Sequence, residues 1–203
     1  MSSRRVLVVM ARWPAPGRCK SRLAAGIGRG RAAAVQDRLG RHTCAVARRA
    51  QRRLGFELVL AVQGLGPRAC KRWGTALGCD RAVGQGDGGL GLRLQRQLLA
   101  ARRRGAEQVV LVGSDLPLLE ATDLERAFQT LERAPLVLGP AADGGYWLIG
   151  LQGSWPALFS GIPWGSAEVL VHTRRAAARL GLEPAWLSCR HDLDRPADLA
   201  SWR

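Results

Sequence analysis

One acidic residue, Asp115, interrupts an otherwise apolar stretch, VVLVGSDLPLL, at residues 109–119. A carboxylate in such surroundings carries a large desolvation penalty unless a cation or hydrogen-bond donors compensate it. Two interpretations are open. Asp115 is either a turn residue that accepts hydrogen bonds from nearby amides, or an oxygen ligand for Mg²⁺ or Mn²⁺ whose shell is completed by phosphate oxygens.

A basic loop, WPAPGRCKSRL, follows the first apolar run of the chain and is a second candidate for chemistry. Arg18, Lys20 and Arg22 supply its positive charge, and Ser21 stands where a helix could start. Positive charge beside free backbone amides is typical of phosphate binding. The loop lacks the GxxxxGK[ST] pattern of a Walker A loop. It is therefore either a phosphate site of another kind or a basic surface loop.

Two acidic turns, AADGGYWLIG and HDLDRPADL, lie later in the chain. Asp143 in the first is either an ordinary hairpin residue or a candidate general base beside two glycines that allow close approach of a ligand. In the second, Asp192 and Asp194 point the same way on an extended segment and would complete a cation site. Asp194 is otherwise the cap of a helix that begins at Pro196.

The elements that must position these residues alternate between strands and helices. Apolar runs predict strands at 6–11, 56–62, 108–115 and 185–189, and two short strands around a turn within 136–151. Helical spacing and capping signals predict helices at 31–54, 67–77, 92–104, from Thr122 with a capping box to Glu125, and at 166–180, with a closing helix after Pro196. This alternation predicts an α/β fold with a mainly parallel sheet, whose ligands bind beyond the carboxyl ends of its strands.

Composition limits the class of protein. The 203 residues, 47% of them hydrophobic, fit one domain with a substantial core. No run is long enough to span a bilayer and no signal peptide is recognised, so we expect a cytoplasmic protein without a membrane span. The five cysteines form no zinc pattern. The net charge of +15 is nearly all arginine and is spread over many segments with few aromatics, so we expect no specific nucleic-acid partner.

Read together, these motifs resemble a known family, the glycosyltransferase-A-like group often described as radical-SAM/selenodomain-associated transferase 1. Some of its members are assigned to arsenosugar biosynthesis. The motifs are PAPGRCKSRL, LGLRL, GSDLP, GPAADGGYWLIGL, PWGSAEVL and DLDRPADL, in chain order and over nearly the whole chain. The resemblance implies a single Rossmann-like nucleotide-diphospho-sugar transferase domain over residues 1–203, with a central mixed, mostly parallel sheet flanked by helices.

The resemblance also implies roles for individual residues. It implies nucleotide-phosphate contacts at Pro16, Gly17, Lys20, Ser21 and Arg22, to which we add the neighbouring or facing cations Arg18 and Arg93. It implies a sugar or acceptor side at Gly144, Gly145 and Tyr146, to which we add Trp164. It implies a metal at Asp115, with Asp192 and Asp194 nearby, and we take Asp143 as the candidate catalytic residue. A two-acid motif at the strand end is absent, because residue 113 is glycine.

The motifs and the charge leave three functions open. The first, which the resemblance favours, is transfer of a sugar from a nucleotide-sugar to a small-molecule acceptor with Mg²⁺ or Mn²⁺. The second is transfer of a nucleotidyl group from an NTP to a phosphorylated small molecule, since the PGRCKSRL loop also resembles the opening loop of such enzymes. The third, a basic nucleic-acid-binding protein, is motivated by charge alone and would show steeply salt-dependent affinity.

Overall fold

A single mixed sheet organises the molecule, which the computed structural model describes from residue 4 to residue 202. The strands are β1 (Arg5–Arg12), β2 (Glu57–Gln63), β3 (Arg81–Gly84), β4 (Gln108–Gly113), β5 (Leu136–Pro140), β6 (Tyr146–Leu151) and β7 (Ala185–Trp186). Their order across the sheet is β3-β2-β1-β4-β6-β5-β7. Strand β6 is antiparallel to both neighbours and the other pairings are parallel. The predicted single α/β domain with a mixed, mostly parallel sheet is confirmed.

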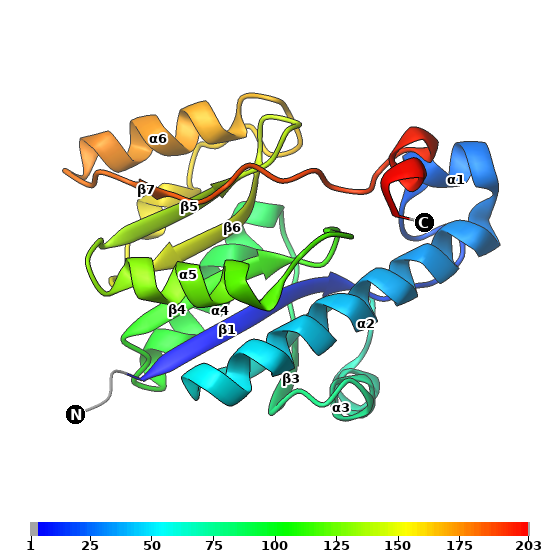
Figure 1. The fold of residues 1–203 in the computed structure, drawn as a ribbon, viewed down its shortest axis with the longest axis horizontal. Helices are drawn as coiled ribbons and strands as arrows, with labels where there is room; N and C mark the ends of the chain where they lie inside the picture. Colours follow the sequence, from blue (N-terminus) through cyan, green and yellow to red (C-terminus); the bar gives the residue numbers. More distant parts are fainter. Residues whose placement is uncertain (1–3, 203) are drawn as a thin grey trace.

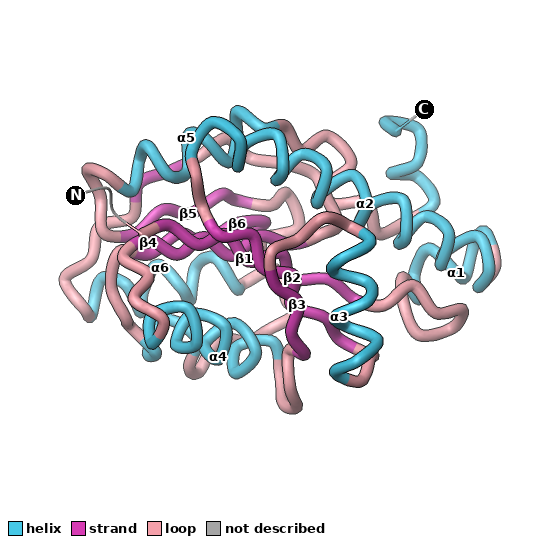
Figure 2. The backbone as a smooth tube through the Cα atoms, turned by 90° about the horizontal axis from the view of Figure 1, so that it is seen from below, coloured by secondary structure: helices cyan, strands magenta, loops and turns pink. Residues whose placement is uncertain are grey.

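Helices cover both faces of the sheet (Figures 1 and 2). They are α1 (Ser21–Ile27), α2 (Arg29–Leu54), α3 (Pro67–Ala76), α4 (Leu90–Arg103), α5 (Ala121–Leu131) and α6 (Val169–Arg179), with two 3₁₀ helices, η1 (Pro156–Phe159) and η2 (Pro196–Trp202). Figure 2 shows α2, α3 and α5 on one side of the strands and α4 and α6 on the other. The sheet therefore has no face open to water over its centre.

This two-sided cover explains why the central strands read as continuous apolar runs. Successive side chains of a strand point to opposite faces. Leu7 and Val9 of β1 belong to the core under α2, α3 and α5, whereas Val6 and Val8 belong to the core under α4 and α6. Each such side chain is almost fully buried, which stabilises the fold by roughly 1.5–3 kcal/mol per residue.

The chain changes direction across the sheet between β1 and β4. From β1 it continues to β2 and β3 on one side, and from β4 it passes through α5 to β5 on the other side. The two strands are parallel and Met10 is paired with Gly113, so their carboxyl ends lie together. Such a switch point leaves a crevice in which ligands of α/β proteins bind.

The segment after β7 carries the second acidic turn back to this crevice. The Arg190 amide donates to Pro140 O, and the Leu193 amide donates to Asp115 O at 2.9 Å. Figure 1 shows this segment running from β7 to the region of α1, where η2 lies beside the first helix. Leu193 packs with Leu23 of α1 in a small separate core. The late acidic turn is thereby held next to the end of β4.

Several predicted elements differ in their ends. The helix predicted at 31–54 begins at Arg29 and is preceded by α1, and β3 was not predicted. The predicted last strand has only two residues paired with β5, and the closing helix is of the 3₁₀ type.

The predicted helix caps were wrong at two positions. The capping box of α5 joins Glu120 and Asp123, not Thr122 and Glu125, because the N-cap lies two residues earlier. Helix α6 has Glu168 at its N-cap, and Ser166 instead donates a hydrogen bond to Pro163 O within the preceding turn.

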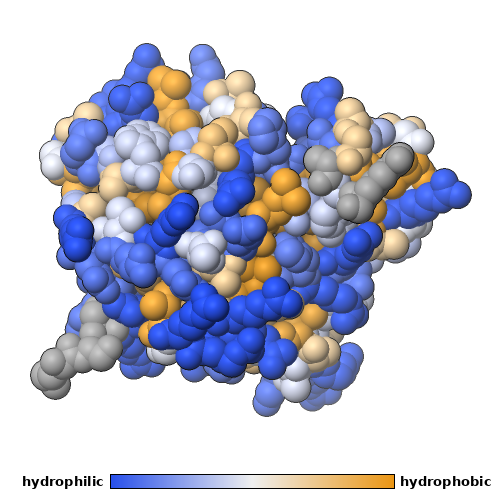
Figure 3. Space-filling model, viewed as in Figure 1, coloured by the Kyte–Doolittle hydropathy of each residue, from blue (hydrophilic) through white to orange (hydrophobic). Residues whose placement is uncertain are grey.

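The surface carries the excess of arginine. Figure 3 shows a face covered mostly by hydrophilic residues. Helix α2 carries the exposed Arg38, Arg41 and Arg48. In the part of the chain that the structure describes, no helix is long and apolar enough to cross a membrane.

Candidate functional site

Lys20 lies at the centre of the crevice in a strained conformation. Its φ and ψ are both 49°, and it is the only non-glycine residue with positive φ among residues 4–202. A left-handed backbone of this kind costs of order 1–3 kcal/mol for a residue with a Cβ and is concentrated at functional sites. The Lys20 side chain is 2% exposed. Its Nζ lies 2.6 Å from Leu193 O and 2.8 Å from Asp115 Oδ1.

Asp115, at the end of β4, keeps one unsatisfied oxygen despite this ion pair. Oδ1 is buried and accepts no hydrogen bond, because Nζ of Lys20 approaches it outside hydrogen-bond geometry. Lys20 directs its hydrogen bonds to Leu193 O and, at 3.5 Å, to Asp194 Oδ1. The charge of Asp115 is compensated by Lys20, and the hydrogen-bonding capacity of Oδ1 remains for a donor or cation brought by a ligand.

A basic chamber of about 440 Å³ opens above the ends of β1 and β4. Its charged lining comprises Arg12, Lys20, Arg22, Arg93, Asp115 and Asp194. Nε of Arg93 is buried without a hydrogen-bond partner, and Arg22 reaches Asp194 Oδ2 at 3.2 Å. Four cations against two carboxylates make this chamber suited to an anion such as a diphosphate.

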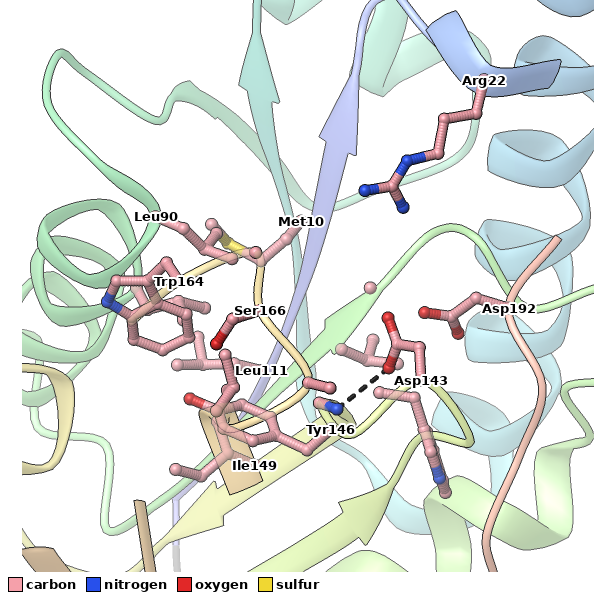
Figure 4. Close-up of a pocket in the computed structure, with 18 of the residues that line it drawn as sticks. Met10, Arg22, Leu90, Leu111, Asp143, Tyr146, Ile149, Trp164, Ser166 and Asp192 are labelled. Atoms are coloured by element: carbon pink, nitrogen blue, oxygen red, sulfur yellow. Dashed lines mark hydrogen bonds between the residues drawn. The ribbon is translucent and has the colours of Figure 1, made fainter. Parts of the chain in front are cut away.

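An apolar chamber of about 530 Å³ adjoins it. The two chambers share Met10, Arg22 and Leu90. Figure 4 shows Asp143 and Asp192 on one side of the apolar chamber and Leu111, Tyr146, Ile149 and Trp164 on the other. A ligand that occupies both chambers would therefore place its middle beside Arg22.

Asp192 is the most perturbed carboxyl group of the site. Burial, and after it the negative charges of Asp115 and Asp143, raise its pKa to about 7, while Lys20 opposes the shift. Acids that repel one another in a cleft are typical of sites that act on protons or bind a cation.

The comparisons with known proteins agree with this architecture. Residues 46–166, more than half of the chain, match a family described as an uncharacterized protein conserved in bacteria, DUF2064. The chain belongs to the DUF2064 family. No curated protein matches it significantly in sequence.

Solved structures place the chain in the nucleotide-diphospho-sugar transferase superfamily. A provisionally named nucleotide-diphospho-sugar transferase from Desulfovibrio desulfuricans G20 is 30% identical, with 97% of this chain and 85% of that chain covered and a TM-score of 0.84. CMP:2-keto-3-deoxy-manno-octonic acid synthetase in complex with CTP is 14% identical, with coverage of 98% and 96% and a TM-score of 0.61. Rv0371c from Mycobacterium tuberculosis H37Rv in complex with manganese is 21% identical, with coverage of 100% and 98% and a TM-score of 0.59. The last two likenesses show the fold alone.

The basic loop of this DUF2064 protein divides into two parts. Lys20, Ser21 and Arg22, together with Arg93 from α4, line the basic chamber as the predicted phosphate contacts would. Pro16 and Gly17 lie in the exposed turn before them and are not among the lining residues. Arg18 lies at a separate small hollow, where its carbonyl accepts a hydrogen bond from Arg12.

Most residues predicted for the acceptor side lie together around the apolar chamber. Asp143, Gly145, Tyr146 and Trp164 all line the apolar chamber. The Tyr146 and Trp164 rings meet edge to face with their centroids 6.0 Å apart. Asp143 Oδ1 accepts a hydrogen bond from the Gly145 amide at 2.9 Å, so the turn interpretation of this residue is confirmed.

Gly144 shapes the turn and is not among the residues that line the apolar chamber. Its φ is 89°, and a Cβ placed there would lie 2.1 Å from Ala167 O. Its carbonyl accepts a hydrogen bond from the Leu170 amide. The turn thereby docks on the segment that leads into α6, which fixes one wall of the apolar chamber.

Sequence reasoning missed several polar residues of the basic chamber. Gln85 is buried and donates through Nε2 to Ala11 O and to Ala61 O, both at 3.0 Å, at the ends of β1 and β2. Gln36 of α2 is also buried and donates to Ser114 Oγ at 3.4 Å. Nothing in the sequence distinguishes these glutamines from others, because their role depends on where strands and helix meet.

The chemistry of the acids fits a divalent cation in part. Across residues 4–202, no group of three or more His, Cys, Asp or Glu side chains is arranged to hold a metal ion. The unsatisfied Asp115 Oδ1 and the crowded Asp192 nevertheless offer oxygen ligands of the kind that Mg²⁺ and Mn²⁺ take. Mg²⁺ commonly uses one or two carboxylates and completes its shell with substrate phosphates and water. Asp194 is less available than Asp115, because two cations, Lys20 and Arg22, lie against it and, in the described part of the chain, only Lys20 lies against Asp115.

Proposed function

We propose that the protein is a metal-dependent transferase that uses a nucleotide-sugar donor to glycosylate a small-molecule acceptor. One observation carries the proposal: the buried, strained Lys20 and Asp115, 2.8 Å apart, line a cationic chamber that adjoins an apolar one at Arg22. The membership of the nucleotide-diphospho-sugar transferase superfamily supports it.

The basic chamber would take the nucleotide part of the donor. Lys20, Arg22 and Arg93 would donate charge-assisted hydrogen bonds to diphosphate oxygens, which are stronger than neutral ones. Because Lys20 is already held by Leu193 O and by the strained backbone, it loses little freedom when a ligand binds. The same three cations would stabilise the negative charge that develops on the diphosphate as it leaves.

A divalent cation would be held by Asp115 and Asp192. Asp194 would contribute less, because it is already paired with Lys20 and Arg22. When bound, it would offset negative charge on the diphosphate leaving group. The manganese complex of Rv0371c, a protein with the same fold, is consistent with such use.

Asp143 is our candidate for the group that accepts the acceptor's proton. It lines the apolar chamber, and the Gly145 amide fixes one of its oxygens, so the other is left for the acceptor. Asp192, in the segment after β7, lines the same chamber beside Asp143. A carboxylate within hydrogen-bond reach of the reacting hydroxyl is the geometric requirement for a general base.

We infer further that the chain is of the radical-SAM/selenodomain-associated transferase 1 kind, the group that includes arsenosugar-biosynthesis-type glycosyltransferases. The support is the ordered run of motifs from PAPGRCKSRL to DLDRPADL. The residues that this resemblance names for the phosphate and acceptor sides largely line the two chambers.

Nucleotidyl transfer from an NTP is the second candidate. The excess of cations over carboxylates in the basic chamber also suits a triphosphate, and a neighbour of the same fold is a synthetase in complex with CTP. Release of pyrophosphate from an NTP with a phosphorylated acceptor would favour this reaction over sugar transfer.

A thermal-shift panel with Mn²⁺ tests these alternatives. It compares UDP, GDP, CDP, their sugar conjugates and the four NTPs, because a ligand that binds only the folded state raises the melting temperature. Asp115→Ala is the site variant, and Asp87→Ala, at an exposed acid in the loop before α4, is the matched control.

We expect a Mn²⁺-dependent shift with one diphosphate or its sugar conjugate that is lost in Asp115→Ala and kept in Asp87→Ala. A shift confined to an NTP would replace sugar transfer by nucleotidyl transfer. A shift equal in both variants would remove the metal role of Asp115.

A further inference from the structure

The apolar chamber has two ends of different chemistry. One end is formed by the carboxylates of Asp143 and Asp192, near Arg22. The other end, which we call the apolar end, is formed by Met10, Leu90, Leu111, Tyr146, Ile149 and Trp164. Of these six side chains, only Tyr146 and Trp164 carry a hydrogen-bonding nitrogen or oxygen, and the hydroxyl of Ser166, which lies beside them, donates to Pro163 O.

Core residues form the floor of the apolar end. Leu111 is 2% exposed and Ile149 is 1% exposed, and both belong to the core between the sheet and α4. Leu94 of α4, also buried, lines the same chamber. An apolar ligand that covers these side chains removes their surface from water, which favours its binding.

We propose that the acceptor carries an apolar body, aromatic or branched aliphatic, that fills the apolar end, and a hydroxyl group that faces Asp143 and Asp192. This inference rests on the proposed sugar transfer and specifies its acceptor class. A polyol in the same place would leave most of its hydroxyl groups without partners, and each such buried group is unfavourable by about 1–3 kcal/mol.

The position of the two ends fits the direction of the reaction. The acceptor oxygen forms a bond to the anomeric carbon of the donor while the bond from that carbon to the diphosphate oxygen breaks. The hydroxyl proton passes to a carboxylate at the acidic end, and the nucleoside diphosphate leaves through the basic chamber. Arg22 lines both chambers, so it would contact the diphosphate as it leaves at the junction of the two.

A matched pair of probes tests the acceptor class. The probes are 2-phenylethanol and xylitol, two alcohols of similar size and opposite polarity. Their binding to the full chain is measured by tryptophan fluorescence, since Trp147 and Trp164 line the chamber, and their glycosylation is followed by mass spectrometry with Mn²⁺ and each nucleotide-sugar. We expect 2-phenylethanol to bind at least tenfold more tightly than xylitol and to be the better acceptor.

Two leucines of α4 supply the variant and its control. Leu90 is 43% exposed and lines the chamber, whereas Leu92 is 58% exposed and is not among the lining residues. Both lie near the start of the helix, so glutamine is tolerated at either position. We expect Leu90→Gln to weaken 2-phenylethanol binding several-fold and Leu92→Gln to leave it unchanged.

The possible outcomes separate this inference from the proposed function. If a nucleotide diphosphate binds but xylitol binds as tightly as 2-phenylethanol, the acceptor class is wrong and sugar transfer stands. Equal effects of Leu90→Gln and Leu92→Gln would likewise overturn the assignment of the apolar end. If no nucleotide binds while the selectivity for 2-phenylethanol and its sensitivity to Leu90→Gln persist, sugar transfer fails and the apolar site remains.

Discussion

Replacement of Asp192 by asparagine should stabilise the free protein, and the gain should depend on pH. Burial, together with the charges of Asp115 and Asp143, raises the pKa of Asp192 from 3.8 to about 7. The folded state therefore binds the proton more tightly than the unfolded state does. The stability that this provides is fully present below the unfolded pKa and is lost as pH rises through the folded pKa. Asparagine removes the ionisation and keeps the shape of the side chain.

The size of the effect follows from the two pKa values. A difference of about 3 units corresponds to roughly 4 kcal/mol when the group is fully ionised in both states. Between about pH 5 and about pH 8, the advantage of the variant should grow by roughly 2–3 kcal/mol. For a chain of this length, that is a widening of the melting-temperature gap by about 5–10 °C.

Thermal unfolding in EDTA from about pH 5 to about pH 8 measures this gap. Asp87→Asn serves as control because it removes an equal charge at an exposed position, and its gap should stay flat. A gap between wild type and Asp192→Asn that does not change with pH would refute the claim that repulsion and burial act on this carboxyl group. When Mn²⁺ replaces EDTA, the wild type should be stabilised and Asp192→Asn should not, since the cation would relieve the repulsion among Asp115, Asp143 and Asp192.

Three further predictions concern other parts of the molecule. Lys20→Met should weaken binding of a nucleoside diphosphate by about tenfold or more, because a charge-assisted hydrogen bond is lost. Titration calorimetry measures the affinity, and an unchanged value would remove Lys20 from the phosphate site. Gly144→Ala should lower the free energy of unfolding in urea by about 2–4 kcal/mol, since its Cβ would lie 2.1 Å from Ala167 O. In the control Gly181→Ala, φ is 69° and the space around the Cβ is open, so the loss should be only about 1–2 kcal/mol. Equal losses in the two variants would contradict the docking of the turn. The sulfur atoms of Cys44 and Cys79 lie 3.9 Å apart, so excess glutathione disulfide should oxidise the two thiols to a disulfide. Each thiol loses one hydrogen, and the reagent is reduced to two glutathione molecules. Peptide mapping that finds Cys79 only as a mixed disulfide with glutathione would contradict this.

Much of the fold was predictable because its signals are local. The run VLVVMA is apolar without alternation, and β1 is indeed covered on both faces. Gly55 ends α2 in a left-handed conformation with its amide bonded to Gln51 O, as a glycine after a long helix predicts. The hairpin of β5 and β6 around Asp143 was also readable from its turn residues.

What the sequence did not predict depends on tertiary contacts. Strand β3 is short and only partly apolar, and it exists because β2 offers it a parallel edge. Ser166 resembles a helix cap, but its hydroxyl is used by the turn before α6. The strained backbone of Lys20 is invisible in the sequence, since a lysine gives no sign of positive φ.

The candidate site was predictable as a set of residues and not as an arrangement. Lys20, Arg22 and Asp115 are conspicuous in type and place, and they meet because β1 and β4 are neighbours and parallel. Pro16 and Gly17 belong to the same motif, yet they lie in the exposed turn outside the chamber. The division into a basic and an apolar chamber could not be predicted, because it arises where α4 and the segment before α6 meet the sheet.

The isolated acid in VVLVGSDLPLL now has a physical explanation. Asp115 is tolerated because Lys20 lies 2.8 Å away, but one buried lysine faces several carboxylates and makes its hydrogen bonds elsewhere. The repulsion that remains is carried by Asp192, whose pKa rises to about 7. A protein selected for stability alone would replace that acid by a neutral residue. An arrangement of acids that is unfavourable when empty gains free energy when a cation and a diphosphate enter, and this difference between the two states is what a ligand-binding site requires.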